Sequence, residues 1–248
     1  MKTQIKTDEE IMHMRQSGKI LHDILVILTR EAKPGVTTKR LDDIAASELK
    51  KHSAKAAFLG YNGFPASICI SVNEEIVHGI PKERELIDGD IVGLDFGVNY
   101  KGMITDSAVT IGIGKISRDQ QRLLDYTKKA LYSAIDVLKD GVRVGDIGEA
   151  VDKQLGAGNL KVIRNLGGHG VGHKVHEDPI ILNFGHSGTG ETLRAGMTIA
   201  IEPIASIGTH DTYLADDGWT YVTSDGSMSA QFEHTILITQ SGAEILTA

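Results

Sequence analysis

The sequence predicts an α+β fold made of two related halves. Three observations support this prediction: patterns typical of helices and then strands occur in the same order twice, short motifs recur at nearly the same spacing, and the composition is that of a globular protein. Of the 248 residues, 41% are hydrophobic and 24% are charged, a balance that excludes a mainly disordered chain.

Two helices are predicted at the start of the first half. Residues 7–10 match a capping box, and apolar residues at helical spacing continue over residues 11–28. Pro34 and the glycine after it end this helix. Thr37 or Thr38 can then cap a second, shorter helix.

Strands and turns follow these helices. Apolar runs at residues 68–72, 91–96 and 108–113 predict strands. A second capping box opens a helix over residues 117–138, and a shorter helix is predicted near residues 145–155. A glycine-rich stretch and further strands complete this order of elements, which repeats the order of the first half.

The internal repeat is the observation that decides the architecture. The Gly-Val pair at Gly35 resembles the pair at Gly141, and each follows a long predicted helix. Residues 86–95 resemble residues 193–202 at almost the same offset. Several matches in one order favour a pseudo-twofold arrangement over two independent units.

The repeat also aligns residues of similar chemistry. It pairs Asp95 with Glu202, Asp106 with Glu233, and His78 with His176. The four acids lie in or beside apolar strands, where a carboxylate is costly unless it is paired, protonated or bound to a metal. The alternative is that each acid sits at a strand end and points into water.

The first two acids belong to a predicted hairpin. If Tyr100 and Lys101 are its turn residues, Asp95 pairs directly with Asp106. Their Cβ atoms would then lie ~5 Å apart on one face, where like charges are destabilising. A divalent cation between them would turn this repulsion into ligation, because such ions prefer hard oxygen ligands.

The glycine-rich stretch at residues 165–179 contains three histidines, His169, His173 and His176. It does not fit a nucleotide-binding loop, because His173 stands where the last glycine of that motif is required. The helical zinc motif is absent as well. A surface loop with incidental histidines is the alternative, but beside the repeat-matched acids we interpret these imidazoles as candidates for metal or substrate contacts.

Four carboxylates and one imidazole would make a mostly oxygen site with room for two metals. Paired metals commonly serve hydrolysis, because they lower the pKa of water and polarise a carbonyl group. The single cysteine excludes a thiolate-rich zinc site. The residues alone therefore predict a metal-dependent hydrolase and leave its substrate open.

Charge and composition predict the surroundings in which the protein acts. A single cysteine favours a reducing compartment, and no apolar run approaches the roughly 20 residues that cross a bilayer. The start of the sequence lacks a signal peptide. The net charge of −7 comes without a basic patch, which argues against nucleic acid as the primary ligand. We therefore expect a cytoplasmic protein without membrane association.

Over essentially its whole length, the sequence resembles the type I methionine aminopeptidases. The matching stretches are Leu59–Tyr61, Cys69–Glu75, Val77–Pro81, Gly89–Ile91, Gly168–Gly172, His176–Pro179, Gly196–Thr198, Ile201–Pro203, Asp217–Thr220 and Ser229–Thr235. The resemblance implies the pita-bread fold, with two pseudo-twofold-related halves around a mostly antiparallel sheet and helices on the outer face. It also implies one catalytic domain over residues 1–248, with halves of roughly 1–115 and 116–248.

The resemblance implies a dinuclear centre that removes the N-terminal methionine from nascent proteins, with preference for a small second residue. The implied metal ligands are Asp95, Asp106, His169, Glu202 and Glu233. Glu202 would act as general base, His176 would stabilise charge on the carbonyl oxygen, and His78 would contact the scissile amide. The two divalent cations could be Co, Mn, Fe or Zn, since availability decides among them.

The methionine pocket implied by the resemblance is apolar. Its residues would be Phe58, Tyr61, Phe64, Cys69, Val175 and Trp219. Phe58 stands where relatives often carry a small residue or cysteine, and Val175 stands where an aromatic residue is common. We expect these two differences to offset each other in volume.

The expected partners are nascent polypeptide N-termini and, transiently, the ribosome, which would meet the catalytic unit's own surface. We expect a monomer. Two alternative functions remain: a Xaa-Pro aminopeptidase or prolidase-like hydrolase of the same fold, and a non-catalytic pita-bread protein that binds partners. Retention of all five implied metal ligands argues against the second alternative.

Overall fold

The structure is a computed structural model, and it describes residues 5–248. Helices α1 (Asp8–Glu31) and α2 (Thr38–Lys51) begin the chain, as predicted. Thr7 and Glu10 form both hydrogen bonds of the predicted capping box. Of the two threonines considered for α2, Thr37 is the N-cap, and its side chain accepts the N–H of Arg40.

Three of the five strands described in the first half lie at the apolar runs that predict them, and two short strands lie outside those runs. The five strands are β1 (Lys55–Ala56), β2 (Cys69–Val72), β3 (Glu75–Val77), β4 (Ile91–Tyr100) and β5 (Met103–Gly112), with the short helix η1 (Tyr61–Gly63) before β2. Strand β4 pairs with β1, β2 and β5, always antiparallel.

The second half repeats the order of two helices followed by strands. Helices α3 (Arg118–Asp136) and α4 (Val144–Ala157) match the predicted helices within a few residues. The strands are β6 (Lys161–Val162), β7 (Gly167–Gly170), β8 (Glu177–Leu182), β9 (Thr198–Ile201), β10 (Ile204–Ser206), β11 (Thr212–Leu214), β12 (Tyr221–Thr223), β13 (Ser229–Gln231), β14 (His234–Ile238) and β15 (Ala243–Ile245).

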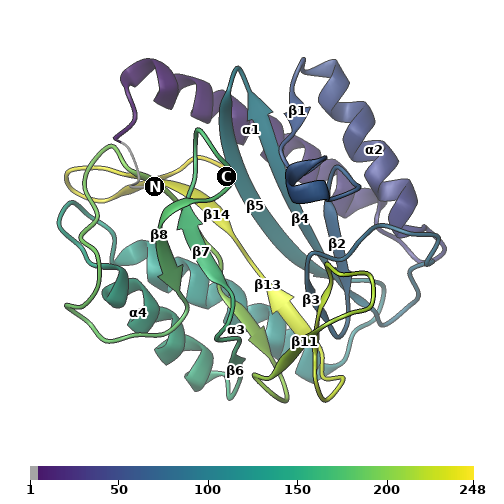
Figure 1. The fold of residues 1–248 in the computed structure, drawn as a ribbon. Helices are drawn as coiled ribbons and strands as arrows, with labels where there is room; N and C mark the ends of the chain where they lie inside the picture. The colour runs from purple at the N-terminus through teal and green to yellow at the C-terminus, as the bar shows by residue number, and fades with distance from the viewer. Residues whose placement is uncertain (1–4) are drawn as a thin grey trace.

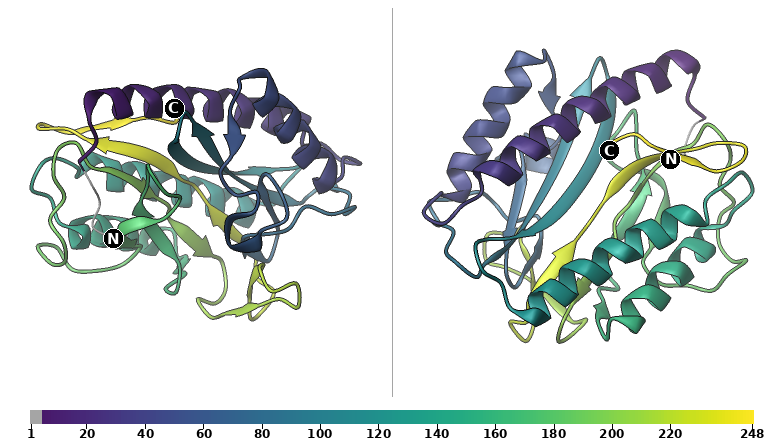
Figure 2. Two further views of the ribbon diagram at one scale, coloured as in Figure 1. Left: turned by 45° about the horizontal axis from the view of Figure 1, so that its top comes forward. Right: turned by 180° about the vertical axis from the view of Figure 1, so that it is seen from behind.

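Antiparallel strands form the centre of the molecule. In the second half, five strands pair in the order β15-β14-β9-β7-β8, and β10 pairs with β13 and β6. Seen from behind, helices α1, α3 and α4 cover the strands, whose opposite face is turned toward the viewer in Figure 1 (Figures 1 and 2). This arrangement confirms the predicted fold class of antiparallel strands with helices on the outer face.

The two halves share details of backbone hydrogen bonding. Gly35 donates its N–H to the carbonyl of Leu86, and Gly141 donates in the same way to Leu193. Both glycines have positive φ angles, 85° and 88°, which an L side chain rarely adopts. The Gly-Val turns of the sequence repeat therefore hold equivalent positions in the two halves.

The register predicted for the β4–β5 hairpin is wrong by two residues. Lys101 and Gly102 occupy the turn, with φ angles of 51° and 89°, so Asp106 pairs with Gly97 and Asp95 with Ala108. A two-residue turn of this kind requires positive φ at both central positions, and Gly102 adopts it more readily than Tyr100 would. Because side chains alternate with a period of two, the shift leaves both acids on the same face.

Each pair of helices packs on its own part of the strands. The first apolar cluster joins α1 and α2 to β2 and β4, and the second joins α3 and α4 to β9 and β14. Within residues 5–248, none of the helices has the length and apolar character required to span a bilayer.

Candidate metal and peptide site

The structure brings all of the predicted site residues to one cavity of about 140 Å³, which we call the front cavity. It lies on the face of the strands opposite α1 and α3. The front cavity is lined by Phe58, Tyr61, Asn62, Phe64, Cys69, His78, Asp95, Asp106, His169, Val175, His176, Glu202, Trp219, Gln231 and Glu233. Acids and imidazoles gather at one end, and aromatic and aliphatic side chains form the other walls.

Three residues from different strands converge closely enough to share one cation. Asp106 on β5, His169 on β7 and Glu233, just before β14, each offer a ligand atom, and these atoms all lie within 4.8 Å of one another. Glu202 approaches the same group, with its Oε1 3.8 Å from Nε2 of His169. Backbone pairing of Glu233 with Ala108 and of His169 with Ala200 fixes these strands relative to each other.

Buried oxygens in this cluster lack partners, which is what a metal site requires. Oδ1 of Asp95, Oδ1 of Asp106 and Oε1 of Glu233 have no hydrogen-bond partner among the described residues. An unsatisfied buried carboxylate oxygen is costly, so such a group in a native structure implies a ligand or a bound proton. Carboxylate oxygens with one imidazole suit divalent first-row cations.

Burial dominates the electrostatics of the acids. It raises the pKa of Asp95 to about 7 and the pKa of Glu202, which also faces Asp95, to about 8. Burial, followed by repulsion among the acids, raises the pKa of Asp106 and of Glu233 well above the usual range. A bound dication favours the deprotonated ligand and would oppose this effect.

The imidazoles of the front cavity are neutral at physiological pH for the same reason. Burial lowers the pKa of His169 to about 3 and the pKa of His78 to about 4, and it also lowers the pKa of His176. A neutral imidazole is the form that binds metal. Nδ1 of His169 lies 2.9 Å from the carbonyl of Gly170, which leaves Nε2 facing the acids.

His176 is oriented by an aromatic neighbour. The hydroxyl of Tyr61 lies 2.9 Å from Nδ1 of His176, and the His176 ring packs edge-on against His169. If Tyr61 donates this hydrogen bond, Nε2 of His176 carries the proton and can donate to a substrate.

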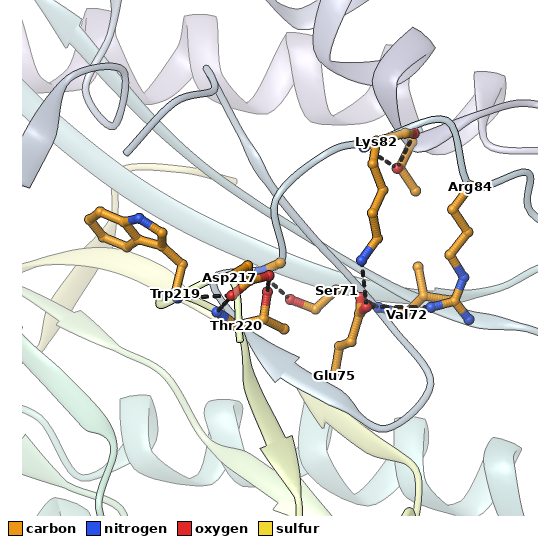
Figure 3. A network of polar contacts seen from close by, with 10 residues as sticks. Ser71, Val72, Glu75, Lys82, Arg84, Asp217, Trp219 and Thr220 are labelled. Atoms are coloured by element: carbon orange, nitrogen blue, oxygen red, sulfur yellow. Dashed lines mark hydrogen bonds and ion pairs between the residues drawn. The ribbon is translucent and has the colours of Figure 1, made fainter. Parts of the chain in front are cut away.

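His78 lies directly after β3 in a left-handed conformation with φ of 61°. Strand β3 is held by Glu75, which accepts the N–H of Val72 and pairs with Lys82 and Arg84 (Figure 3). The polar contacts of Glu75 thus fix strand β3, and β3 in turn fixes the strained backbone of His78 that follows it.

The loop before β8, which carries His176, is anchored to the start of the chain. Lys6 and Glu177 form a buried ion pair of 2.9 Å, and Glu177 also accepts the N–H groups of His173 and Lys174. A Cβ atom at Gly172 would lie 2.3 Å from Cε of Lys6 and would displace it, and the φ of 153° at this position is one that L side chains rarely adopt. His173, one of the three histidines of the glycine-rich stretch, lies outside the front cavity and hydrogen-bonds Glu10.

The apolar end of the front cavity contains every residue predicted for the methionine pocket. The rings of Phe64 and Trp219 meet edge to face at 5.2 Å. Asp217 accepts the N–H groups of Trp219 and Thr220 and so holds the turn that presents the indole (Figure 3). The missing side chain of Gly97 admits Phe58, because a Cβ there would lie 2.6 Å from its ring.

Two cavity residues were not identified from the sequence. Nε2 of Gln231 donates a 3.0 Å hydrogen bond to Oε2 of Glu202, and Asn62 lines the cavity near Tyr61. Gln231 lies two positions before Glu233, and residues two apart in a strand share a face, so this spacing was an available signal. Nothing in the sequence around Asn62 indicates a place in the site.

Comparison with known proteins identifies the family of this chain. The sequence profile of metallopeptidase family M24 matches residues 12–240. The methionine aminopeptidase of Clostridium perfringens is 44% identical over 243 residues, covering 98% of this chain and 98% of the relative. Methionine aminopeptidase 1 of Bacillus subtilis is 44% identical over 242 residues, again covering 98% of each chain.

Solved structures show the same likeness. The crystal structure of methionine aminopeptidase from Rickettsia prowazekii matches with a TM-score of 0.97 at 40% identity, covering 99% of this chain and 100% of that one. The prolidase from Pyrococcus horikoshii matches with a TM-score of 0.78 at 22% identity, covering 98% of this chain and 63% of the prolidase. The second likeness concerns the fold alone.

Proposed function

The chain belongs to metallopeptidase family M24 and, within it, to the methionine aminopeptidases, and we propose that it hydrolytically removes the N-terminal methionine of newly made proteins. The observation that carries this proposal is the front cavity itself. Buried acids with unpartnered oxygens stand at one end of it, and an apolar pocket large enough for a flexible side chain stands at the other.

Two divalent cations would fit the donor set, with Asp106 and Glu233 between them, Asp95 completing one site, and His169 with Glu202 completing the other. Up to four carboxylate charges would offset two dications, which removes the repulsion that adds to burial in raising the pKa values of Asp106, Glu202 and Glu233. Bound ions supply an activated water and polarise the scissile carbonyl. The donor chemistry suits Co, Mn, Fe or Zn.

The chain's own groups position the substrate and move protons. Glu202 accepts the proton of the attacking water, and Gln231 holds its second oxygen by the 3.0 Å hydrogen bond. His176, oriented by Tyr61, donates to the carbonyl oxygen on which charge develops. His78 lies across the cavity and contacts the scissile amide.

The apolar end of the front cavity receives the methionine side chain. Phe58, Phe64, Val175 and Trp219 supply apolar and aromatic walls, against which a thioether packs favourably. The larger Phe58 and the smaller Val175 offset each other in volume. The free α-amine lies near Asp95, so internal peptide bonds are not presented, and the narrow cavity favours a small second residue.

The setting proposed for this activity follows the same reasoning. Residues 1–248 form one catalytic domain, which acts as a monomer in the cytoplasm on nascent polypeptide N-termini. Any ribosome contact is transient and uses the surface of this domain.

Hydrolysis of a Met-Ala-Ser peptide tests the proposal. We expect methionine release by protein supplied with manganese or cobalt, loss of release with a chelator, and recovery when the ion is returned. Cleavage of Xaa-Pro peptides instead of Met-Ala-Ser would show a prolidase-like enzyme. No release with any of several divalent ions, from folded protein that also fails to bind them, would show a non-catalytic binding protein.

A further inference from the structure

A second cavity, of about 300 Å³, lies behind the strands, and we call it the rear cavity. Helices α1 and α3 form its sides, and β5 and β14 form its floor, as the rear view shows these elements side by side (Figure 2). The rear cavity is lined by His22, Leu25, Val26, Thr29, Arg30, Ser107, Ala108, Val109, Lys128, Leu131, Tyr132, Phe232, His234 and Thr247.

The ionisable side chains of the rear cavity are all basic or phenolic. Arg30 and His22 come from α1, Lys128 from α3 and His234 from β14, and no Asp or Glu is among the lining residues. This is unusual for a chain with 33 acidic and 26 basic residues. Among residues 5–248, the side chains of Arg30 and Lys128 make no ion pair or hydrogen bond, so their charges are free to meet a ligand.

The rear cavity has apolar walls and polar groups on its floor. Leu25, Leu131 and Phe232 give it apolar walls. On the floor, Nδ1 of His234 lies 2.8 Å from the Thr247 hydroxyl, while Nε2 has no hydrogen-bond partner among the described residues. A ligand with an apolar body would therefore meet polar partners at the charged side chains of Arg30 and Lys128 and at His234 on the floor.

We propose that the rear cavity binds a small organic anion, a carboxylate or a phosphate monoester with an apolar body. Arg30 and Lys128 at the rim would hold the anionic group, since charge-assisted hydrogen bonds are the strong ones and Arg suits planar, two-pronged contacts. The apolar body would lie against Leu25, Leu131 and Phe232, which removes their surface from water. This proposal does not depend on the peptidase activity.

The rear cavity lies directly behind two of the segments that line the front cavity. Ser107 and His234 on its floor directly follow Asp106 and Glu233, and successive strand residues face opposite sides of a sheet. The Ser107 hydroxyl also donates a 2.6 Å hydrogen bond to the carbonyl of Glu233. An anion seated here would therefore contact the backs of two strands that present metal-ligand candidates.

Isothermal titration of the metal-loaded protein tests the proposal. The probes are phenyl phosphate and 4-phenylbutyrate for the two anion types, benzyl alcohol as a neutral analogue, and inorganic phosphate as an anion without an apolar body. We expect saturable binding of at least one of the two organic anions. Benzyl alcohol and inorganic phosphate should bind at least about 10-fold more weakly than that anion.

Charge removal at the rim identifies the site. The double variant Arg30→Gln with Lys128→Gln should weaken the organic anion about 100-fold, or about 10-fold for each cation. Lys129→Gln is the matched control, because Lys129 is the next residue of α3 and does not line the rear cavity. The Lys129→Gln variant should bind the organic anion as tightly as the parent protein does.

Three results would overturn the proposal. The first is that neither organic anion binds. The second is that benzyl alcohol or inorganic phosphate binds as tightly as the organic anions. The third is that the double variant binds as tightly as the parent, which is also the result expected of a probe held by metal ions in the front cavity.

Discussion

The two faces of β5 and β14 carry opposite chemistry within one residue of each other. On the front face stand Asp106 and Glu233, buried carboxylates that each have one oxygen without a partner among the described residues. On the rear face stand Ser107 and His234, below a rim that carries Arg30 and Lys128. Alternation along a strand places these side chains on opposite sides of one layer.

The difference shows that the sign of the unpaired charges at a cavity indicates the kind of ligand, whereas the burial of polar groups does not. Both faces contain buried polar groups, but the front face has an excess of oxygen acceptors and the rear face an excess of donors and cations. An excess of oxygen acceptors favours binding of a metal cation, and an excess of donors and cations favours binding of an anion. Each of the following predictions tests this contrast between adjacent residues.

The largest expected effect is a difference in kcat/KM between a variant on the front face and a variant on the rear face. Glu233→Gln should lower kcat/KM for Met-Ala-Ser by at least ~100-fold, because an amide is a much weaker ligand for a dication than the carboxylate proposed here, and replacing even outer groups of metal sites costs 10–100-fold. His234→Gln, at the next position, should stay within a few-fold of the parent. Equal losses in both variants would end the distinction between the faces, and circular dichroism would establish that each variant is folded.

The next effect is a pair of opposite pH dependences of stability in the metal-free protein. Burial raises the pKa of Asp95 to about 7, so its contribution is present at low pH and is lost as pH rises through about 7. Burial lowers the pKa of His234 to about 4, so its contribution is present above the ordinary histidine pKa and is lost as pH falls toward 4. Thermal unfolding of parent and variant from pH 4 to 8 measures both.

The sign of each difference decides the outcome. Asp95→Asn should gain Tm relative to the parent as pH rises from 5 to 8, and His234→Gln should gain relative to the parent as pH falls from 7 to 4. Adding manganese should abolish the first gain and leave the second unchanged. Parallel pH profiles for parent and variant would show that these groups do not differ between the folded and unfolded states.

The smallest effect concerns the hydrogen bond that joins the two faces. Ser107→Ala removes the donor to the Glu233 carbonyl and should lower the free energy of unfolding by ~1 kcal/mol, with kcat changed only a few-fold. Urea unfolding measures this loss. Ser133→Ala on α3 is the control, because its hydroxyl has no hydrogen bond among the described residues, and its stability should not change.

The residues predicted for the site from the sequence line the front cavity, whereas no sequence pattern indicated the rear cavity. The four acids were recognisable because each interrupts an apolar strand, where a charge needs a reason. The residues of the apolar pocket came only through family resemblance, since Phe58 or Val175 alone reads as core. The hairpin register was missed because turn geometry, and not the spacing of the acids, determines strand pairing.

Contacts between distant segments were beyond local patterns. Lys6 and Glu177 are 171 positions apart, and neither carries a motif that indicates its partner. Arg30 and Lys128 read as ordinary surface charges on separate helices. Only the packing of α1 and α3 against the strands brings these cations to one opening.

The ion pair between Lys6 and Glu177 and the hydrogen bonds between β5 and β14 have a consequence for biosynthesis. Asp106 and Thr235 form two hydrogen bonds across 129 positions, so the two segments that join here are made far apart in time. Interactions that span so much of the chain form late in folding, because the loop they close must first lose its freedom. A growing chain therefore cannot bring the candidate metal ligands together until Glu233 and β14 have been made.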